Sequence, residues 1–97
     1  MARWQIEDIT HSGRKGIKGE SRTDGRYPQR INRVVELDLQ DINIGFPLIL
    51  NYILDENGND YSRYYLRTSN VVGVYIKDDY CEIETNNSVF GLRYLGE

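Results

Sequence analysis

Short apolar segments that alternate every second residue, separated by tight-turn sequences, constrain the fold of this chain more than any other feature. The clearest spans residues 35–39, where Val, Leu and Leu alternate with Glu and Asp. This pattern is typical of a strand with one buried face and one solvated face. Apolar residues nowhere recur every 3.6 residues over three turns, so we expect at most a single helical turn, near Leu39 to Asn43.

Further strands are expected on both sides of this segment. Residues 4–9 alternate imperfectly, which predicts a first strand with a bend or bulge near Asp8. The apolar run at 48–54 predicts a central strand buried on much of both faces. The tyrosine-rich residues 61–66 predict an edge strand, reached through a hairpin turn at Asn57-Gly58.

The C-terminal third has the pattern of a β-meander. Apolar residues alternate in three runs, which are Val72, Val74 and Ile76, then Cys81, Ile83 and Thr85, then Phe90, Leu92 and Tyr94. Turns are expected at 77–80 and at Asn86-Asn87. Five to seven strands joined mostly by tight turns predict an all-β fold, a small antiparallel β-barrel, SH3-like or similar, that closes to avoid open edges. The length of 97 residues fits a single domain, 1–97, with one core.

Residues 71–95, VVGVYIKDDYCEIETNNSVFGLRYL, resemble the closing hairpins of SH3-like or Sm-like small barrels. The chain as a whole resembles small β-barrel proteins of phages and bacterial mobile elements. The resemblance implies a binding module. It also implies a possible role as an antagonist of bacterial defence, which blocks an enzyme or sequesters a nucleotide messenger.

The charge is distributed unevenly along the chain. Residues 1–34 contain eight Lys or Arg against four Asp or Glu, whereas residues 35–97 contain four against eleven, which gives the net charge of −3. The acidic total argues against a general nucleic-acid coat. No apolar run approaches the roughly 20 residues that cross a bilayer, and the N-terminal sequence lacks the apolar core of a signal peptide, so we expect a cytoplasmic protein.

A basic glycine-rich loop, residues 11–30, is the main candidate binding site. Glycines allow backbone N–H groups to approach an anion closely, and arginine offers paired donors to phosphate oxygens. The spacing matches neither a Walker A loop nor the dinucleotide fingerprint. The pattern is also compatible with a short strand around Ile17, and with a solvated loop that neutralises the acidic remainder or contacts a partner protein. The residues predicted to bind a phosphate-bearing ligand are Arg14, Lys15, Lys18, Arg22 and Arg26 in the loop, and Arg67, Thr68 and Ser69 beyond it.

Catalytic and metal-binding patterns are weak. His11 is the only histidine, and its neighbour Ser12 would point to the opposite face of an extended chain, so no triad is predicted and we expect no enzymatic activity. Residues 55–60 resemble the start of a calcium loop, but glycine falls at the fourth position instead of the sixth, and a hairpin turn explains them better. The lone Cys81 has no partner for a disulfide or a metal cluster, and no cofactor is expected.

Two main functional hypotheses follow. In the first, a non-enzymatic barrel captures a nucleotide or nucleotide messenger through the basic loop and acts by sequestration. In the second, a protein-interaction or inhibitor module uses its acidic strand faces and a tyrosine cluster; the residues are Glu36, Asp38, Glu82 and Glu84, and Tyr61, Tyr64 and Tyr65 with Trp4 and Tyr27. Nucleic-acid binding by the loop is a third hypothesis, and association into a homodimer or higher oligomer is compatible with each.

Overall fold

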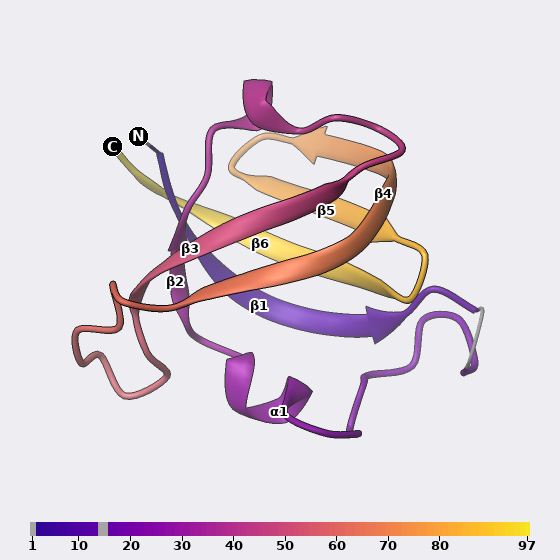
Figure 1. Ribbon diagram of the computed structural model, residues 1–97, viewed down its shortest axis with the longest axis horizontal. Coiled ribbons are helices and arrows are strands. Elements are labelled where there is room, and N and C mark those ends of the chain that lie inside the picture. The colour runs from indigo at the N-terminus through magenta and orange to yellow at the C-terminus, as the bar shows by residue number, and fades with distance from the viewer. Residues whose placement is uncertain (1, 14–15) are drawn as a thin grey trace.

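Six antiparallel strands close into a barrel in the computed structural model, which describes residues 2–13 and 16–97 (Figure 1). The predicted fold class, an all-β small antiparallel barrel, is therefore confirmed. The strands are β1 (Arg3–His11), β2 (Val34–Glu36), β3 (Pro47–Leu54), β4 (Tyr65–Lys77), β5 (Tyr80–Thr85) and β6 (Ser88–Gly96). A short helix α1 (Tyr27–Arg30) and a 3-10 turn η1 (Leu39–Asp41) lie in the connections.

The strands follow one another around the barrel in sequence order, and β1 pairs with β6 to close it. Each backbone ladder is thereby completed, which removes the open edges that invite aggregation. The last three strands form the predicted β-meander, with turns at Asp78 and at Asn86-Asn87. Asp78 has a φ of 53°, the left-handed conformation that a tight turn of this kind uses.

The bulge predicted near Asp8 is present. The register between β1 and β6 shifts between Ile6 and Asp8. Because of this extra residue, Ile6 and Ile9 both point into the core although they are three positions apart. The core is a single cluster that takes residues from every strand.

Strand β3 corrects the prediction that residues 48–54 are buried on both faces. Leu48, Leu50 and Tyr52 point into the core, whereas the side chain of Ile49 is 41% exposed. The outer face of β3 has no second layer of structure over it, so the strand alternates like any strand of a single-walled barrel. The apolar residues on that outer face remain in contact with solvent.

Strand β4 also differs from the expectation. It is one strand of 13 residues that begins at Tyr65, so the edge strand predicted at 61–66 is wrong for all but its last two residues. A register shift between Val71 and Gly73 turns Val71 inward and leaves Val72 and Ile76 exposed. The strand bends at this bulge, as Figure 1 shows for the orange ribbon.

The predicted helical turn near Leu39 is η1, and Asp38 caps it by accepting a hydrogen bond from the Gln40 amide. Helix α1 was not predicted, because four residues are too few to show a helical period. The short strand expected around Ile17 is wrong, since the only bridge of this described segment joins Thr10 to Ser21, and Ile17 is exposed. Within residues 2–13 and 16–97, no helix is long and apolar enough to span a membrane.

Candidate functional site

Three of the predicted binding residues are separated by the fold or lie outside the described part of it. Arg14 and Lys15 lie outside the described residues. Lys18 lines a hollow of about 670 Å³ between the basic loop and β4 and β5. That hollow also contains Glu82 and Glu84, so Lys18 is placed beside two carboxylates and away from the arginines that follow it.

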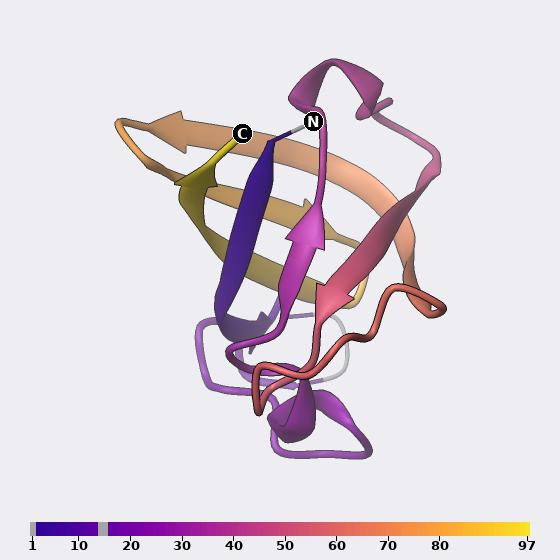
Figure 2. The same ribbon diagram turned by 90° about the vertical axis from the view of Figure 1, so that its left-hand side faces the viewer.

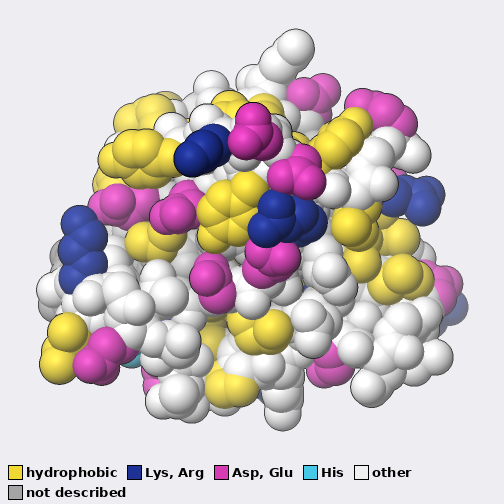
Figure 3. All heavy atoms as spheres, turned by 180° about the vertical axis from the view of Figure 1, so that it is seen from behind, with side chains coloured by type: hydrophobic (Ala, Val, Ile, Leu, Met, Phe, Trp, Pro, Cys, Tyr) yellow, Lys and Arg dark blue, Asp and Glu magenta, His cyan; other side chains and the backbone are white. Residues whose placement is uncertain are grey.

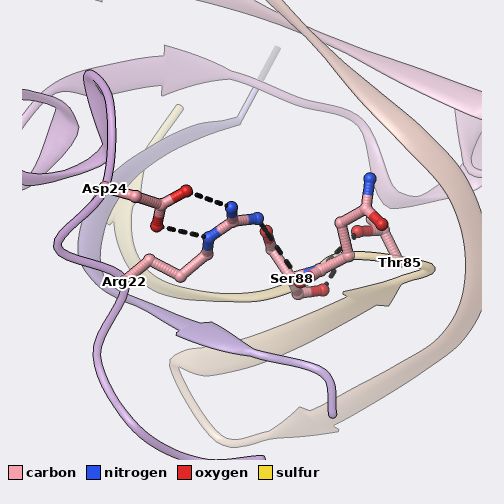
Figure 4. A network of polar contacts seen from close by, with 5 residues as sticks. Arg22, Asp24, Thr85 and Ser88 are labelled. Carbon is pink, nitrogen blue, oxygen red and sulfur yellow. Dashed lines mark hydrogen bonds and ion pairs between the residues drawn. The ribbon is translucent and has the colours of Figure 1, made fainter. Parts of the chain in front are cut away.

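Arg22 is held inside the fold (Figure 4). Its Nη1 donates to Ser88 Oγ at 2.8 Å, and its Nε and Nη2 donate to the Asp24 carboxylate at 3.1 and 2.5 Å. The guanidinium carbon also lies 3.9 Å from the centroid of the Tyr27 ring. The hydrogen bond from Arg22 holds the pKa of Asp24 below its usual value. These contacts use the donors that a phosphate would need.

Residues 67–69, which were also predicted to bind the ligand, lie in different environments. Thr68 is buried, and its hydroxyl accepts from the Leu48 amide and donates to the Ser69 carbonyl. Ser69 Oγ accepts from the Asn87 amide, at the turn whose carbonyl also accepts from Arg22. The basic loop and Ser69 therefore do meet, but across a turn that both of them brace. Arg67 faces outward from β4 and is exposed.

His11 is half-buried at the end of β1, and Gly16 lies directly against its ring. The Ser12 hydroxyl donates to the Asn86 carbonyl, so Ser12 and His11 form no hydrogen-bonded pair. No group of three or more His, Cys, Asp or Glu side chains in the described residues is arranged to hold a metal ion. Asp55 accepts from the Asn57 and Asn59 amides, as the hairpin-turn interpretation of 55–60 predicted.

Arg26 belongs to a different site, which we call the arginine–tyrosine pocket. It lies at the end of the barrel where α1 faces the connection between β3 and β4, and both Figure 1 and Figure 2 show these segments together. The hollow has a volume of about 210 Å³. It is lined by Arg26, Gln29, Arg30, Arg33, Tyr52, Tyr61, Tyr64, Tyr65 and Leu66.

Local backbone bonds position the arginines of this pocket. Asn32 ends the helical segment with a φ of 75°, and its amide donates to the Ile6 carbonyl while Ile6 donates to the Arg33 carbonyl. These two hydrogen bonds connect the segment to β1, and the side chain of Arg33 points toward the barrel wall. Tyr27 lies beneath two guanidinium groups, at 3.9 Å from Arg22 and 4.7 Å from Arg30. These stacked contacts fix the helix against the loop.

The tyrosines come from β3, from the start of β4 and from the connection between them. The Tyr61 amide donates to Ile53, and the Tyr52 amide donates to the Tyr64 carbonyl, so the connection folds back along β3. The Tyr61 ring stacks on Tyr64 at 4.5 Å and meets Tyr52 edge-on at 5.1 Å. The result is a cluster in which Tyr52 is buried and Tyr64 and Tyr65 are 56% and 62% exposed.

Arg33 forms the floor of the pocket. It is buried, its guanidinium lies 4.8 Å from the Tyr61 ring and 5.1 Å from the Tyr52 ring, and it pairs with both Glu56 oxygens at 3.3 and 3.4 Å. Burial lowers the pKa of Arg33, but the Tyr52 hydroxyl and Glu56 together outweigh it, and the net shift is upward. The guanidinium therefore remains charged at any pH at which the barrel is folded.

Two features of the pocket are unsatisfied. Arg26 and Arg30 pair with no carboxylate among the described residues. The Tyr52 hydroxyl is buried and makes no hydrogen bond of standard geometry within the described part of the chain, although it lies near Arg33. Buried polar atoms normally have a partner, so an atom without one is a place where a ligand or a water can bind.

The sequence indicated the components of this pocket without their assembly. The sequence predicted Arg26 as a ligand-binding residue of the basic loop, and Tyr61, Tyr64 and Tyr65 as part of a tyrosine cluster. Tyr52 was assigned only to a central strand, and no sequence signal links it to an arginine. Comparison of the chain with protein-family models, curated proteins and solved structures gives no match. The geometry of the site therefore carries the functional argument.

Proposed function

We propose that this chain is a non-enzymatic binding protein that captures a nucleotide, and that the arginine–tyrosine pocket is its binding site. The observation that carries the proposal is the convergence of three guanidinium groups and four tyrosine rings on one hollow. A nucleotide carries a phosphate and a nucleobase. Arginine recognises the phosphate, and aromatic faces recognise the nucleobase.

The phosphate is assigned to Arg26 and Arg30. Both are free of carboxylate partners in the described part of the chain, so their donors are available. Arginine presents two parallel N–H groups that match two phosphate oxygens. Among the ion pairs of residues 2–13 and 16–97, Glu56 is the carboxylate that pairs with an arginine of the pocket, Arg33, so the hollow keeps an excess of positive charge.

The base is assigned to the tyrosines at the mouth. Tyr64 and Tyr65 expose large rings next to each other in sequence, so their faces are available for a contact. Stacking of a base on such a ring contributes about 1–3 kcal/mol and tolerates any base. The Tyr52 hydroxyl at the inner wall supplies a hydrogen bond to the ligand.

The volume limits the ligand. Pockets that enclose a drug-sized molecule measure about 300–1,000 Å³. The arginine–tyrosine pocket, at about 210 Å³, is smaller. It suits a single nucleotide unit, part of which remains in solvent, and is too small to enclose a dinucleotide.

Sequestration is the mechanism that we propose for this barrel. A ligand held by preformed arginines and stacked rings is removed from solution without any bond being broken. The role as an antagonist of bacterial defence, which the phage-like resemblance suggested, is part of this proposal where the captured nucleotide is a messenger. Of the acidic side chains of the second hypothesis, Glu36 lies on β2 and Glu82 and Glu84 lie on β5, strands that are not neighbours in the barrel, whereas Asp38 caps η1.

The experiment is a calorimetric titration with nucleoside 5′-monophosphates and cyclic mono- and dinucleotides, using inorganic phosphate as the minimal probe. We expect a nucleotide to bind and inorganic phosphate to bind more weakly. Arg26→Ala and Arg30→Ala should each weaken nucleotide binding by about tenfold or more, because a hydrogen bond to a charged group contributes about 1.5–3 kcal/mol. The melting temperature should stay unchanged for Arg26→Ala, whereas Arg30→Ala also removes the stack on Tyr27 and should lower it slightly.

Lys18→Ala is the matched control, because Lys18 is an exposed cation of the same basic segment that lines a different hollow. Its affinity should equal that of the unmodified chain. Equal affinity in the Arg26→Ala and Arg30→Ala variants would reject the pocket as the site. A titration that shows no binding heat with any nucleotide would reject the proposed function.

A further inference from the structure

The arginine–tyrosine pocket opens onto a sheet surface that has no covering layer. Tyr65 lines the pocket and is also the first residue of β4, where it lies opposite Asn51 of β3. Arg67 follows two residues later on the same outward side and lies opposite Ile49. We call the outward side chains of these two strands, Ile49, Asn51, Tyr65 and Arg67, the β3–β4 face.

The β3–β4 face is apolar and basic without any carboxylate. Tyr65 is 62% exposed and Ile49 is 41% exposed, and Arg67 between them makes no ion pair with a described residue. The outward residue before Ile49 on β3 is Pro47, and Asn70 lies opposite it on β4. On the other side of β3, Asn51 lies opposite Glu36 of β2, so a polyanion meets one carboxylate at the edge of this surface.

The opposite side of the barrel has the reverse character. Figure 3, seen from behind Figure 1, shows Asp and Glu side chains gathered around a cation. In the acidic region formed by β1, β5 and β6, Arg93 pairs with Glu7 and Asp79. Glu82 and Glu84 point outward from the neighbouring strand. These acidic side chains lie outside β3 and β4, whereas Asp55, Glu56 and Asp60 lie in the connection beside the pocket, where Glu56 pairs with Arg33.

We propose that the nucleotide held in the arginine–tyrosine pocket is one unit of a single-stranded nucleic acid, whose next units lie along the β3–β4 face. This inference rests on the proposed function. Arg67 contacts the backbone phosphate that follows the pocket, and Tyr65 and Ile49 contact the bases. The alternation of a cation with exposed aromatic and apolar side chains is the pattern by which proteins bind single strands without reading their sequence.

The small volume of the pocket supports this reading. A pocket of about 210 Å³ that is open on one side holds one unit and leaves its neighbours outside. Single strands suit the face better than duplexes, because the bases must be unpaired to stack on side chains.

The test compares thymidine 5′-monophosphate with single-stranded oligothymidylates of increasing length, by calorimetry and fluorescence anisotropy on the full chain. We expect the affinity to rise at least tenfold from the mononucleotide to the longer strands and then reach a plateau. The oligonucleotide affinity should fall with salt, by about 0.7 in log affinity per log salt for each phosphate contacted. A duplex of the same length should bind more weakly than the single strand.

Arg67→Glu isolates the β3–β4 face from the pocket, with Arg67→Ala as the milder variant. Each should weaken oligothymidylate binding, by tenfold or more for the charge reversal, and leave binding of the mononucleotide unchanged. Lys77→Glu is the control, because Lys77 is exposed on the same strand ten residues away and lines a different hollow.

The outcomes separate the two proposals. Binding of the mononucleotide with no gain in affinity for longer strands would overturn the proposal of a single-stranded ligand and leave the proposed nucleotide site unaffected. Equal effects of Arg67→Glu and Lys77→Glu, or equal affinity for the duplex, would also overturn it. Loss of all binding, to mononucleotide and strand alike, would reject the proposed function together with this inference.

Discussion

The guanidinium of Arg22 donates to the hydroxyl of Ser88 at 2.8 Å, across 66 residues of sequence. Ser88 is buried at the start of β6 and also exchanges two hydrogen bonds with Thr85 at the end of β5. An arginine in a segment with little regular structure thus fastens that segment to the closing hairpin of the barrel. Arg22, which the sequence predicted to bind a ligand, therefore has a structural role in the fold.

We therefore predict that Arg22→Ala lowers the free energy of unfolding by about 1–3 kcal/mol. The substitution removes the charge-assisted hydrogen bond to the buried Ser88 and the stack of the guanidinium on Tyr27. The contact with Asp24 adds little, since that carboxylate is 55% exposed. Urea denaturation measures the effect. Arg26→Ala is the control and should change stability by less than about 0.5 kcal/mol. An Arg22→Ala variant as stable as the unmodified chain would contradict this assignment.

This contrast shows how far the sequence could predict the site. Charge and glycine content marked residues 11–30 as a basic loop, and the described part of this segment has little regular structure apart from the end of β1 and helix α1. Which arginines face a ligand depends on partners far along the chain, such as Ser88 for Arg22 and Glu56 for Arg33. No local pattern encodes those contacts. The pocket was missed because α1 and the β3–β4 connection meet only in three dimensions.

The fold was more predictable, since alternation with period two is a local signal. It gave the barrel class, the bulge at Asp8, the η1 turn and the last two hairpins. It failed where the chain departs from simple alternation, as at the bulge beside Val71, which leaves Val72 exposed while Val74 packs against the core as expected. It also failed at helix α1, where stacked cation–ring contacts, and not an apolar stripe, stabilise a single turn.

Gly91 provides a test of the closing strand pair. An added Cβ at this position would collide with the Asp8 carboxylate and the Tyr80 hydroxyl, which both lie over the β6 backbone. We predict that Gly91→Ala destabilises the barrel by about 1–3 kcal/mol through overpacking. Thermal and urea denaturation measure the loss.

The collision at Gly91 can be relieved from the other side. Asp8→Ala in the Gly91→Ala background should restore part of the lost stability, whereas Thr10→Ala, on the same strand and paired with Val89, should not. Additive losses in the Gly91→Ala, Asp8→Ala double variant would show that the carboxylate does not occupy this space.

Cys81 should make stability depend on alkaline pH. Burial raises the pKa of its thiol to about 11 from an ordinary value of 9.0. Between these two values the unfolded chain releases the proton and the folded chain keeps it, so the free energy of unfolding falls as pH rises from about 9 to 11.

The measurement is urea denaturation across this range, and Cys81→Ala should flatten the part of the profile that begins near pH 9. The thiol reagent DTNB gives an independent readout, because the native thiol should react far more slowly than the thiol of the urea-unfolded chain. Rapid labelling of the native chain at neutral pH would be inconsistent with the buried position of Cys81.

The adjacent residues Ile49 and Leu50 test the inward and outward faces of β3 directly. Leu50 is completely buried, and Ile49 is 41% exposed on the β3–β4 face. We predict that Leu50→Ala lowers the free energy of unfolding by about 2–5 kcal/mol, because it removes core contacts and leaves a cavity. Ile49→Ala should change it by less than about 1 kcal/mol, since a half-exposed side chain buries little area. Comparable losses for the two variants would mean that the outer face of β3 is covered in solution, by a second copy of the chain, and that the β3–β4 face is not free to receive a ligand.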